Sequence, residues 1–381
     1  MSEEKLQELL SASSLDTWVK YAQQWKQTGK KVVGIIDSYV PEEVLYAGGV
    51  LPIRIMHVAH KYITLASAYR VVHTDGYYTN VLESLLKKEL PFIDGFVFTN
   101  RDDDSRRLYD VVEAVIKPPL IHLMHIPRAT TSPAIRRLKE EIVHLSETLE
   151  NLWDVRIDDD ALRQAAMVYN KSRELMGKLY ELRKRDVPPL SGAEFLRLTT
   201  TAMVIPRDVF NEKLESLMGY LDKRRTSHKH VRPRLLVSSD TMDNPQFIEL
   251  VENTGSLVAM DDLDTGSSYF SLLVDTAEPD IRTALAFRYL NRPGCPRMAS
   301  WDKQITHIIQ QVRDYRIDGV LELPLRNSFA REFRTPIFMS ALKEAKIPAV
   351  SLKREYEYSN ESQLMTRIGS FIEMLDVNVT A

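Results

Sequence analysis

Cysteine is nearly absent from this chain of 381 residues, which contains only Cys295. One thiol cannot form an internal disulfide, and alone it cannot supply the thiolates of a zinc or iron–sulfur centre. Long apolar runs are missing too, because no stretch approaches the ~20 residues of a membrane-spanning helix. The N-terminal residues, MSEEKLQELLSASS, lack the basic and apolar regions of a signal peptide. We therefore expect a cytoplasmic protein that does not enter a membrane.

A surplus of charge is also absent, because 50 basic and 53 acidic residues give a formal net charge of −3. This balance argues against nucleic acid as the main partner, since few unpaired basic groups remain to neutralise phosphates. The sequence contains no GxGxxG, GxxxxGK[ST], GxSxG or HExxH motif and no paired Cys/His spacing. A dinucleotide fingerprint, a P-loop, a hydrolase nucleophile elbow and a zinc site therefore have no support.

Short apolar runs that alternate with amphipathic helices are the dominant pattern. Residues 32–36 and 50–55 flank a helix that begins near Pro41, and the three together predict a β–α–β unit. PFIDGFVFTN and PPLIHLMHIPR predict two further strands, and the residues from 132 to about 184 are helical and charged. After residue 233, strands are expected at RLLVSSD, SLVAMDD, IDGVLELPL and IPAVSLKREY. The fold class is therefore α/β, with two α/β domains of mostly parallel sheets (1–130 and 231–381) joined by a helical segment (131–230).

The two halves of the chain echo each other around an Asp-Gly strand. FIDGFVFTNRDDD in the first half corresponds to RIDGVLELPLRNS in the second. Ligands of open α/β sheets bind beyond the carboxyl ends of the strands. We therefore expect the functional cleft near Asn100 and Arg326, where these two strands end.

The block Asp102-Asp103-Asp104 follows the first Asp-Gly strand. Aspartates in this position can hold magnesium, but Asp102 or Asp103 is also a good N-cap for the helix that follows, and capping is the commoner role. His73 and Asp75 could form a metal-ligand or acid–base pair, or they could simply belong to a polar loop before a helix. No side chain is assigned as a catalytic base.

Two further segments could bind phosphate. Residues 238–240, Ser-Ser-Asp, follow a predicted strand and could bind a phosphate through helix-terminal amides, although a turn is the commoner role of such residues. The basic segment RRTSHKHVRPR, residues 224–234, could contact the phosphates of coenzyme A or could be a solvated loop.

Several stretches, taken in order, resemble one known family, that of 2-hydroxyacyl-CoA dehydratase and benzoyl-CoA reductase subunits, of the 2-hydroxyglutaryl-CoA dehydratase D-component type. The resemblance covers the chain from about residue 30 to its end. It rests on SYVPEEVLYAGGVLPIRI, PFIDGFVFTN, RPRLLVSSDTMDNPQFIELVENTGSLVAMDD, RYLNRPGCPRM, YRIDGVLELPL, AKIPAVSLKREY and QLMTRIGSFIEML.

The resemblance implies a subunit of a heterodimer of two related chains, which acts on an acyl-CoA. It implies a [4Fe–4S] cluster held by cysteines, and an ATP-dependent activator protein that delivers a low-potential electron. Radical chemistry at the cluster would then remove water, as a lyase does, or reduce an aromatic ring; the sequence favours neither the one reaction nor the other, nor any particular acyl group.

The positions that correspond to the family's three cluster cysteines hold no cysteine here. They fall on Asp75, Asp102 and Ser328, with the first aligned only to within several residues. Cys295, in PGCP, matches a different position. Because thiolates hold the iron of such clusters, we expect this chain to bind no cofactor alone and the cysteine-bearing partner to carry the [4Fe–4S] cluster.

Three functions remain open at this point. The first is a non-cluster subunit that supports radical dehydration or reduction at the partner's cluster. The second is a non-catalytic paralogue that binds an acyl-CoA or serves as a scaffold. The third is a magnesium-dependent enzyme that uses Asp102 and Asp103.

Overall fold

The first half of the chain builds a four-stranded parallel sheet. The computed structural model describes residues 2–71, 73–225, 233–357 and 361–380. The sheet has the order β2-β1-β3-β4, from β1 (Val32–Ile35), β2 (Leu51–Arg54), β3 (Gly95–Thr99) and β4 (Leu120–Met124). All residues of the first three strands are buried, as expected for strands covered on both faces.

The second half repeats this arrangement. Its strands have the order β6-β5-β7-β8, again all parallel, from β5 (Arg234–Ser239), β6 (Leu257–Asp262), β7 (Gly319–Leu323) and β8 (Ala349–Ser351). In both sheets the second strand in sequence lies at one edge and the first lies beside it. The predicted α/β class with parallel sheets is therefore confirmed.

The two Asp-Gly pairs make equivalent contacts in the two sheets. Asp94 accepts a hydrogen bond from the backbone N of Val32 at 2.9 Å, and Asp318 accepts one from the backbone N of Arg234 at 2.7 Å. Each aspartate thereby joins the start of its own strand to the start of the central neighbour. A Cβ added at Gly95 would lie 2.4 Å from the Cβ of Leu120, so glycine is required at this close approach.

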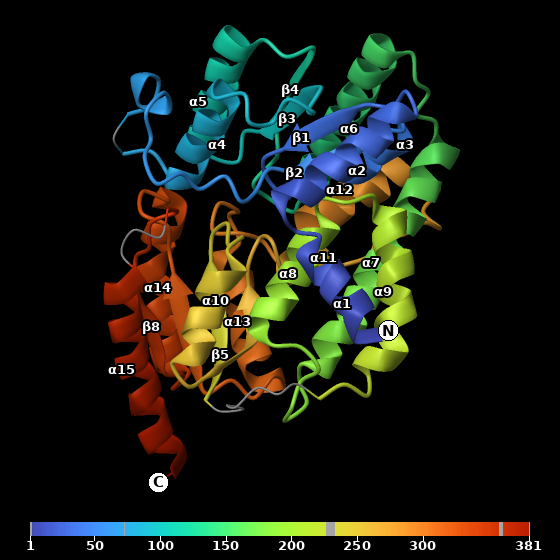
Figure 1. The fold of residues 1–381 in the computed structure, drawn as a ribbon. Coiled ribbons are helices and arrows are strands. Elements are labelled where there is room, and N and C mark those ends of the chain that lie inside the picture. The colour runs from blue at the N-terminus through green and yellow to red at the C-terminus, as the bar shows by residue number, and fades with distance from the viewer. Residues whose placement is uncertain (1, 72, 226–232, 358–360, 381) are drawn as a thin grey trace.

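Helices cover both faces of the sheets and fill the region between them (Figure 1). Local signals set several starts, as where Ser191 and Glu194 form a capping box. The helices of the first half are α1 (Ser2–Ser11), α2 (Leu15–Gln27), α3 (Glu42–Ala47), α4 (Gly76–Leu86) and α5 (Asp103–Val111), with the short turns η1 (Ala66–Ala68) and η2 (Val112–Ile116).

The central and C-terminal helices complete the fold. They are α6 (Ser132–Trp153), α7 (Asp159–Leu182), α8 (Gly192–Ala202), α9 (Arg207–Leu221), α10 (Pro245–Asn253), α11 (Ser267–Phe270), α12 (Ile281–Asn291), α13 (Trp301–Asp314), α14 (Phe329–Glu344) and α15 (Glu361–Thr380). Helix α12, from the second half of the sequence, packs against α6 and α7. In Figure 1 the orange ribbon of α12 accordingly lies beside the first sheet. The proposed residue ranges of the three domains stay a prediction.

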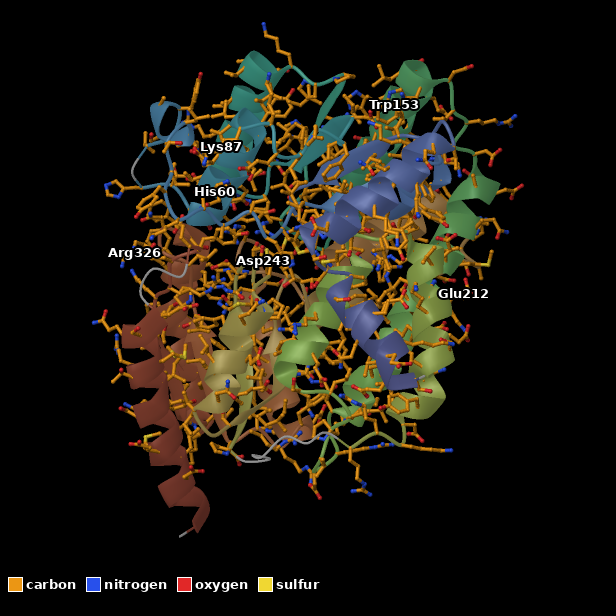
Figure 2. The ribbon with its side chains drawn as sticks, in the orientation of Figure 1. His60, Lys87, Trp153, Glu212, Asp243 and Arg326 are labelled. Atoms are coloured by element: carbon orange, nitrogen blue, oxygen red, sulfur yellow. The ribbon has the colours of Figure 1, made fainter. Side chains whose placement is uncertain are left out.

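The carboxyl ends of the two sheets face each other. Asp243, near the middle of Figure 2, accepts hydrogen bonds from the backbone N of His57 at 2.7 Å and from the Tyr356 hydroxyl at 2.6 Å. Each bond joins a different part of the chain to the loop after β5. Within the described ranges, none of the helices is both long and apolar enough to cross a membrane.

Candidate functional site

A buried salt bridge joins the ends of the two sheets. Arg54 ends β2, Arg101 lies just beyond β3, and both reach Asp264, which lies just beyond β6. The Asp264 carboxylate is 2.5 Å from Nη1 of Arg101 and 3.2 Å from Nη2 of Arg54. Burial raises the pKa of Asp264, but the two guanidinium groups outweigh burial and hold it well below its usual range. The carboxylate therefore stays ionised and ties the two halves together.

Arg297 lies at the centre of the facing strand ends. Its Nε donates to Oδ2 of Asp102 at 2.5 Å, its Nη1 to Oδ1 of Asp240 at 3.2 Å and its Nη2 to Oγ of Ser328 at 3.2 Å. Burial and the nearby Arg101 lower the pKa of Arg297, but its two carboxylate partners outweigh them and raise it. Each nitrogen of this guanidinium thus has a partner from a different part of the chain.

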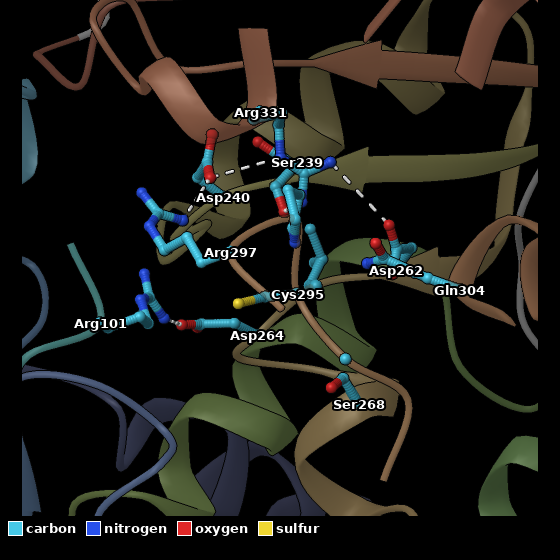
Figure 3. A pocket seen from close by; sticks show the side chains of 13 residues that line it. Arg101, Ser239, Asp240, Asp262, Asp264, Ser268, Cys295, Arg297, Gln304 and Arg331 are labelled. Carbon is cyan, nitrogen blue, oxygen red and sulfur yellow. Dashed lines mark hydrogen bonds and ion pairs between the residues drawn. The ribbon is translucent and has the colours of Figure 1, made fainter. Parts of the chain in front are cut away.

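Asp240 is shared between two arginines. Besides Arg297, it pairs with Arg331 of α14, whose Nε lies 3.3 Å from Oδ1, and its other oxygen accepts from the backbone N of Leu325 at 3.3 Å. Burial raises the pKa of Asp240, but the arginines outweigh it, so that the pKa falls to about 2. Figure 3 shows Asp240 between Arg297 and Arg331.

Asp102 has the capping role that the sequence allowed. Its side chain accepts from the backbone N of Ser105 at 2.8 Å and so caps α5. The same carboxylate accepts from the Tyr78 hydroxyl at 2.9 Å and from Arg297. Burial raises the pKa of Asp102, but Arg297 and Arg101 outweigh burial, so that it is lowered overall. Asp102 is therefore an ionised cap that also anchors the central arginine.

Asp75 lies in the same electrostatic environment. It is buried, and its side chain accepts from the backbone N of Tyr77 and caps α4. Burial and the charges of Asp240 and Asp102 raise its pKa to about 8, although Arg297 acts in the opposite direction. Burial and the neighbouring carboxylates thus favour the protonated form of Asp75.

The three positions singled out in the sequence, Asp75, Asp102 and Ser328, therefore belong to one network of side chains around Arg297. Asp102 and Ser328 contact the same guanidinium, and Asp75 senses its charge. The predicted meeting of the two Asp-Gly strand ends occurs here, one to three residues beyond Asn100 and Arg326. Arg297 carries no recognisable signal in the sequence, because it is a lone arginine after PGCP. The same holds for Arg331, one turn beyond Ser328.

The remaining acidic candidates do not converge. Asp103 is 71% exposed and pairs with Arg107 on its own helix, whereas Asp102 turns toward Arg297. His73 is exposed although Asp75 is buried. Across the described part of the chain, no group of three or more His, Cys, Asp or Glu residues could hold a metal ion. The arrangement therefore lends no support to a magnesium site at Asp102 and Asp103.

The structure describes the first candidate phosphate site, residues 238–240, but only part of the second. The hydroxyl of Ser238 donates to Asp262 and that of Ser239 to the carbonyl of Leu323, while the Asp240 carboxylate lies beside them. These groups are already bonded within the protein, and a buried carboxylate repels phosphate, so the turn interpretation fits better. Of the basic segment, residues 226–232 lie outside the described ranges.

A small cavity lies between three arginines, Arg101, Arg297 and Arg331, and helix α13 (Figure 3). It has room for roughly one water molecule, because only about 10 Å³ of it can hold the centre of a water. Its lining includes Cys295, Arg297 and Gln304. Both amide atoms of Gln304 are buried and have no hydrogen-bond partner among the described residues. A water in this cavity would supply one.

Comparison with known proteins places these features in a family. Residues 37–375 match the family described as 2-hydroxyglutaryl-CoA dehydratase, D-component. A protein of Escherichia coli (strain K12) named as a dehydratase subunit, YjiM, is 25% identical over 92% of this chain and 93% of its own length. A benzoyl-CoA reductase subunit of Thauera aromatica is 24% identical over 93% of this chain and 94% of its own length.

A third relative extends the match to a dehydratase named for its substrate. The beta subunit of (R)-2-hydroxyglutaryl-CoA dehydratase from Acidaminococcus fermentans is 23% identical over 96% of this chain and 97% of its own length. The resemblance stated from the sequence motifs is thereby confirmed. The chain belongs to the 2-hydroxyglutaryl-CoA dehydratase D-component family.

Proposed function

We propose that this chain is the non-cluster subunit of a complex of the 2-hydroxyacyl-CoA dehydratase or benzoyl-CoA reductase type. In this complex, a homologous companion that retains the cysteines holds the [4Fe–4S] cluster, and an ATP-dependent activator protein supplies electrons to it. The substrate is an acyl-CoA. The relatives support the general class, because their names identify them as subunits of dehydratases or of a reductase.

One observation carries the proposal: a guanidinium lies where the family motif would call for cluster ligands. The three aligned positions offer carboxyl, carboxyl and hydroxyl groups, whereas iron–sulfur clusters are held by thiolates. Two of these groups are already bonded to Arg297. The neighbouring cavity has room for roughly one water. These residues do not fit a cluster.

The charges of the site support the same conclusion. A thiolate-bound cluster carries negative charge, which cations or hydrogen-bond donors of the protein would have to balance. Here two ionised carboxylates, Asp102 and Asp240, are neutralised by Arg297 and Arg331. The network is thus electrostatically complete with protein groups alone. Its role in the complex is to hold the two sheets in a fixed relation at the face that adjoins the substrate and the companion.

Iron analysis of the chain with and without its companion tests the proposal. The chain is prepared anoxically alone, and again by co-expression with the homologue that retains the cysteines. We expect no stoichiometric iron or acid-labile sulfide in the isolated chain, and an iron content of the complex that the companion accounts for entirely. Brown isolated chain with the spectrum of a cubane cluster would refute the proposal.

Turnover separates this function from that of a scaffold paralogue. The complex, supplied with the activator, ATP and candidate 2-hydroxyacyl-CoA or aromatic acyl-CoA thioesters, should convert one of them. If the chain binds an acyl-CoA but every reconstituted mixture lacks turnover, the scaffold function is correct instead.

A further inference from the structure

Helix α14 exposes an apolar stripe. Phe329, Phe333 and Ile337 recur at every fourth residue and therefore lie on one face of the helix. Their side chains are 51%, 71% and 50% exposed. The opposite face packs into the protein through the buried Phe338 and Leu342. The stripe is thus separate from the side of the helix that builds the core.

The stripe is confined to the half of α14 that starts next to the side chains around Arg297. Ser328, which contacts Arg297, immediately precedes Phe329. Toward the other end the exposed residues become polar, and Ser340 donates a hydrogen bond to Glu344 at 3.3 Å. An amphipathic surface helix normally carries polar residues over its whole outer face. The apolar half therefore has a function other than solubility.

The loop before α4 extends this apolar surface. Asn327 donates from its side chain to the carbonyl of Thr74 at 3.1 Å, and the backbone N of Thr74 donates to the carbonyl of Val71 at 3.2 Å. Val71, 76% exposed, is thereby held next to the start of the stripe. Figure 1 shows this loop beside the start of α14, on the same side of the molecule. Tyr62, Leu65 and Tyr69 of the loop are exposed as well.

We call these seven residues the α14 face: Tyr62, Leu65, Tyr69, Val71, Phe329, Phe333 and Ile337. Their exposed fractions add up to about four whole side chains, which amounts to at most roughly 800 Å² if each is given the ~200 Å² of an aromatic side chain. The largest apolar patch of a typical monomer covers only ~300–600 Å². A standard stable interface buries ~800 Å² on each partner. The summed apolar area of the stripe and the loop is therefore of the size that one side of a stable interface buries.

The surroundings of the stripe favour a protein over a lipid surface. Arg326 pairs with Glu355, and Lys353 pairs with Glu332 at 2.7 Å. Such a rim of paired charges of both signs around an apolar centre is typical of protein interfaces. A helix that lies on a membrane carries instead a surplus of basic residues on its polar face.

We infer that the α14 face is the docking surface for the companion subunit. This inference rests on the proposed function, which supplies the companion. A companion seated on the stripe would lie one residue from Ser328 and so beside the cluster of side chains around Arg297. A companion docked on this surface would therefore lie next to the facing sheet ends of this chain.

Binding measurements with charged variants test the inference. Phe333→Asp and Val71→Asp each place a carboxylate at one of the two most exposed residues of the face, where a buried interface would desolvate it. Phe287→Asp is the matched control, because Phe287 is a half-exposed phenylalanine on α12, on another part of the surface. Affinity for a homologue that retains the three cluster cysteines is measured by analytical ultracentrifugation under anoxic conditions.

We expect each of the first two variants to bind the companion about tenfold or more weakly, as for hot-spot residues, and the control to bind like the wild type. All three should keep the wild-type circular dichroism. If Phe333→Asp and Val71→Asp bind the companion as tightly as the wild type, the inference is wrong although the proposed function stands. If the wild type binds no companion, both fail. A homodimer of the isolated chain that Phe333→Asp dissociates would identify a second copy as the occupant and overturn the inference.

Discussion

Replacement of Arg297 by methionine is the most direct perturbation of the central network. Methionine keeps much of the length of the side chain but removes all three hydrogen bonds, those to Asp102, Asp240 and Ser328. Asp240 retains Arg331, and Asp102 retains Tyr78 and the backbone N of Ser105. The carboxylates thus lose their shared cation but keep some of their partners.

The expected loss of stability is large. Removing one partner of a buried ion pair typically costs ~3–5 kcal/mol, because the other charge stays buried without compensation. Arg297 is buried and serves two carboxylates. We therefore expect the free energy of unfolding of Arg297→Met to fall by ~3–5 kcal/mol at neutral pH. Arg297→Met combined with Asp102→Asn should regain part of this loss, because the amide leaves no uncompensated charge at position 102 and still caps α5.

The loss should depend on pH in a definite direction. In the folded wild type the pKa values of Asp102 and Asp240 are lowered, to about 2 for Asp240. Such groups contribute stability that is present above the unfolded pKa of ~3.9 and is lost as pH falls through the folded pKa. The variant lacks the cation that lowers these pKa values, so its carboxylates take up protons at a higher pH. The deficit should therefore be larger at pH ~7 than at pH ~4.5.

Urea unfolding followed by circular dichroism measures both quantities. The matched control is Arg326→Met, since Arg326 lies just before α14 but is half exposed and pairs with Glu355. An exposed pair contributes only ~0–1 kcal/mol. A deficit for Arg297→Met no larger than that of the control at pH ~7, or one that grows on acidification, would refute the account of the network.

Three further predictions concern single residues. Asp75→Asn should gain stability relative to the wild type as pH rises from ~5 to ~8 in urea unfolding, because the raised pKa of about 8 makes the folded wild type lose stability over that range while the amide does not ionise; a constant difference would contradict it. Gly95→Ala should lower the unfolding free energy by ~1–3 kcal/mol, since its Cβ would lie 2.4 Å from that of Leu120. Gly177→Ala, whose Cβ meets no atom within 4 Å, should instead raise the unfolding free energy by ~0.5–1 kcal/mol. Equal effects of the two substitutions would exclude the steric explanation. Asp103→Asn should leave the melting temperature and its response to Mg²⁺ unchanged in thermal unfolding, because Asp103 is exposed; a Mg²⁺-dependent stabilisation that this variant loses would restore the magnesium function.

Much of the fold could be predicted because its signals are local. Short apolar runs bounded by proline, glycine and aspartate identified the strands, and the Asp-Gly repeat showed that the two halves are related. The position of helix α12 could not be predicted from the sequence, since it depends on packing against α6, which is far away in the chain. Local periodicity does not encode such a contact.

The candidate site divides in the same way. The sequence by itself determined that no set of thiolates exists, since Cys295 is the only cysteine, and that carboxyl and hydroxyl groups stand at the strand ends. Only the tertiary structure decided that Asp102 and Ser328 meet, because their contact runs through Arg297, a residue distant from both in the chain. The physical reason is that composition and spacing fix which groups are present. The choice of partner for a buried charge depends instead on which surfaces the packing of the two sheets brings within reach.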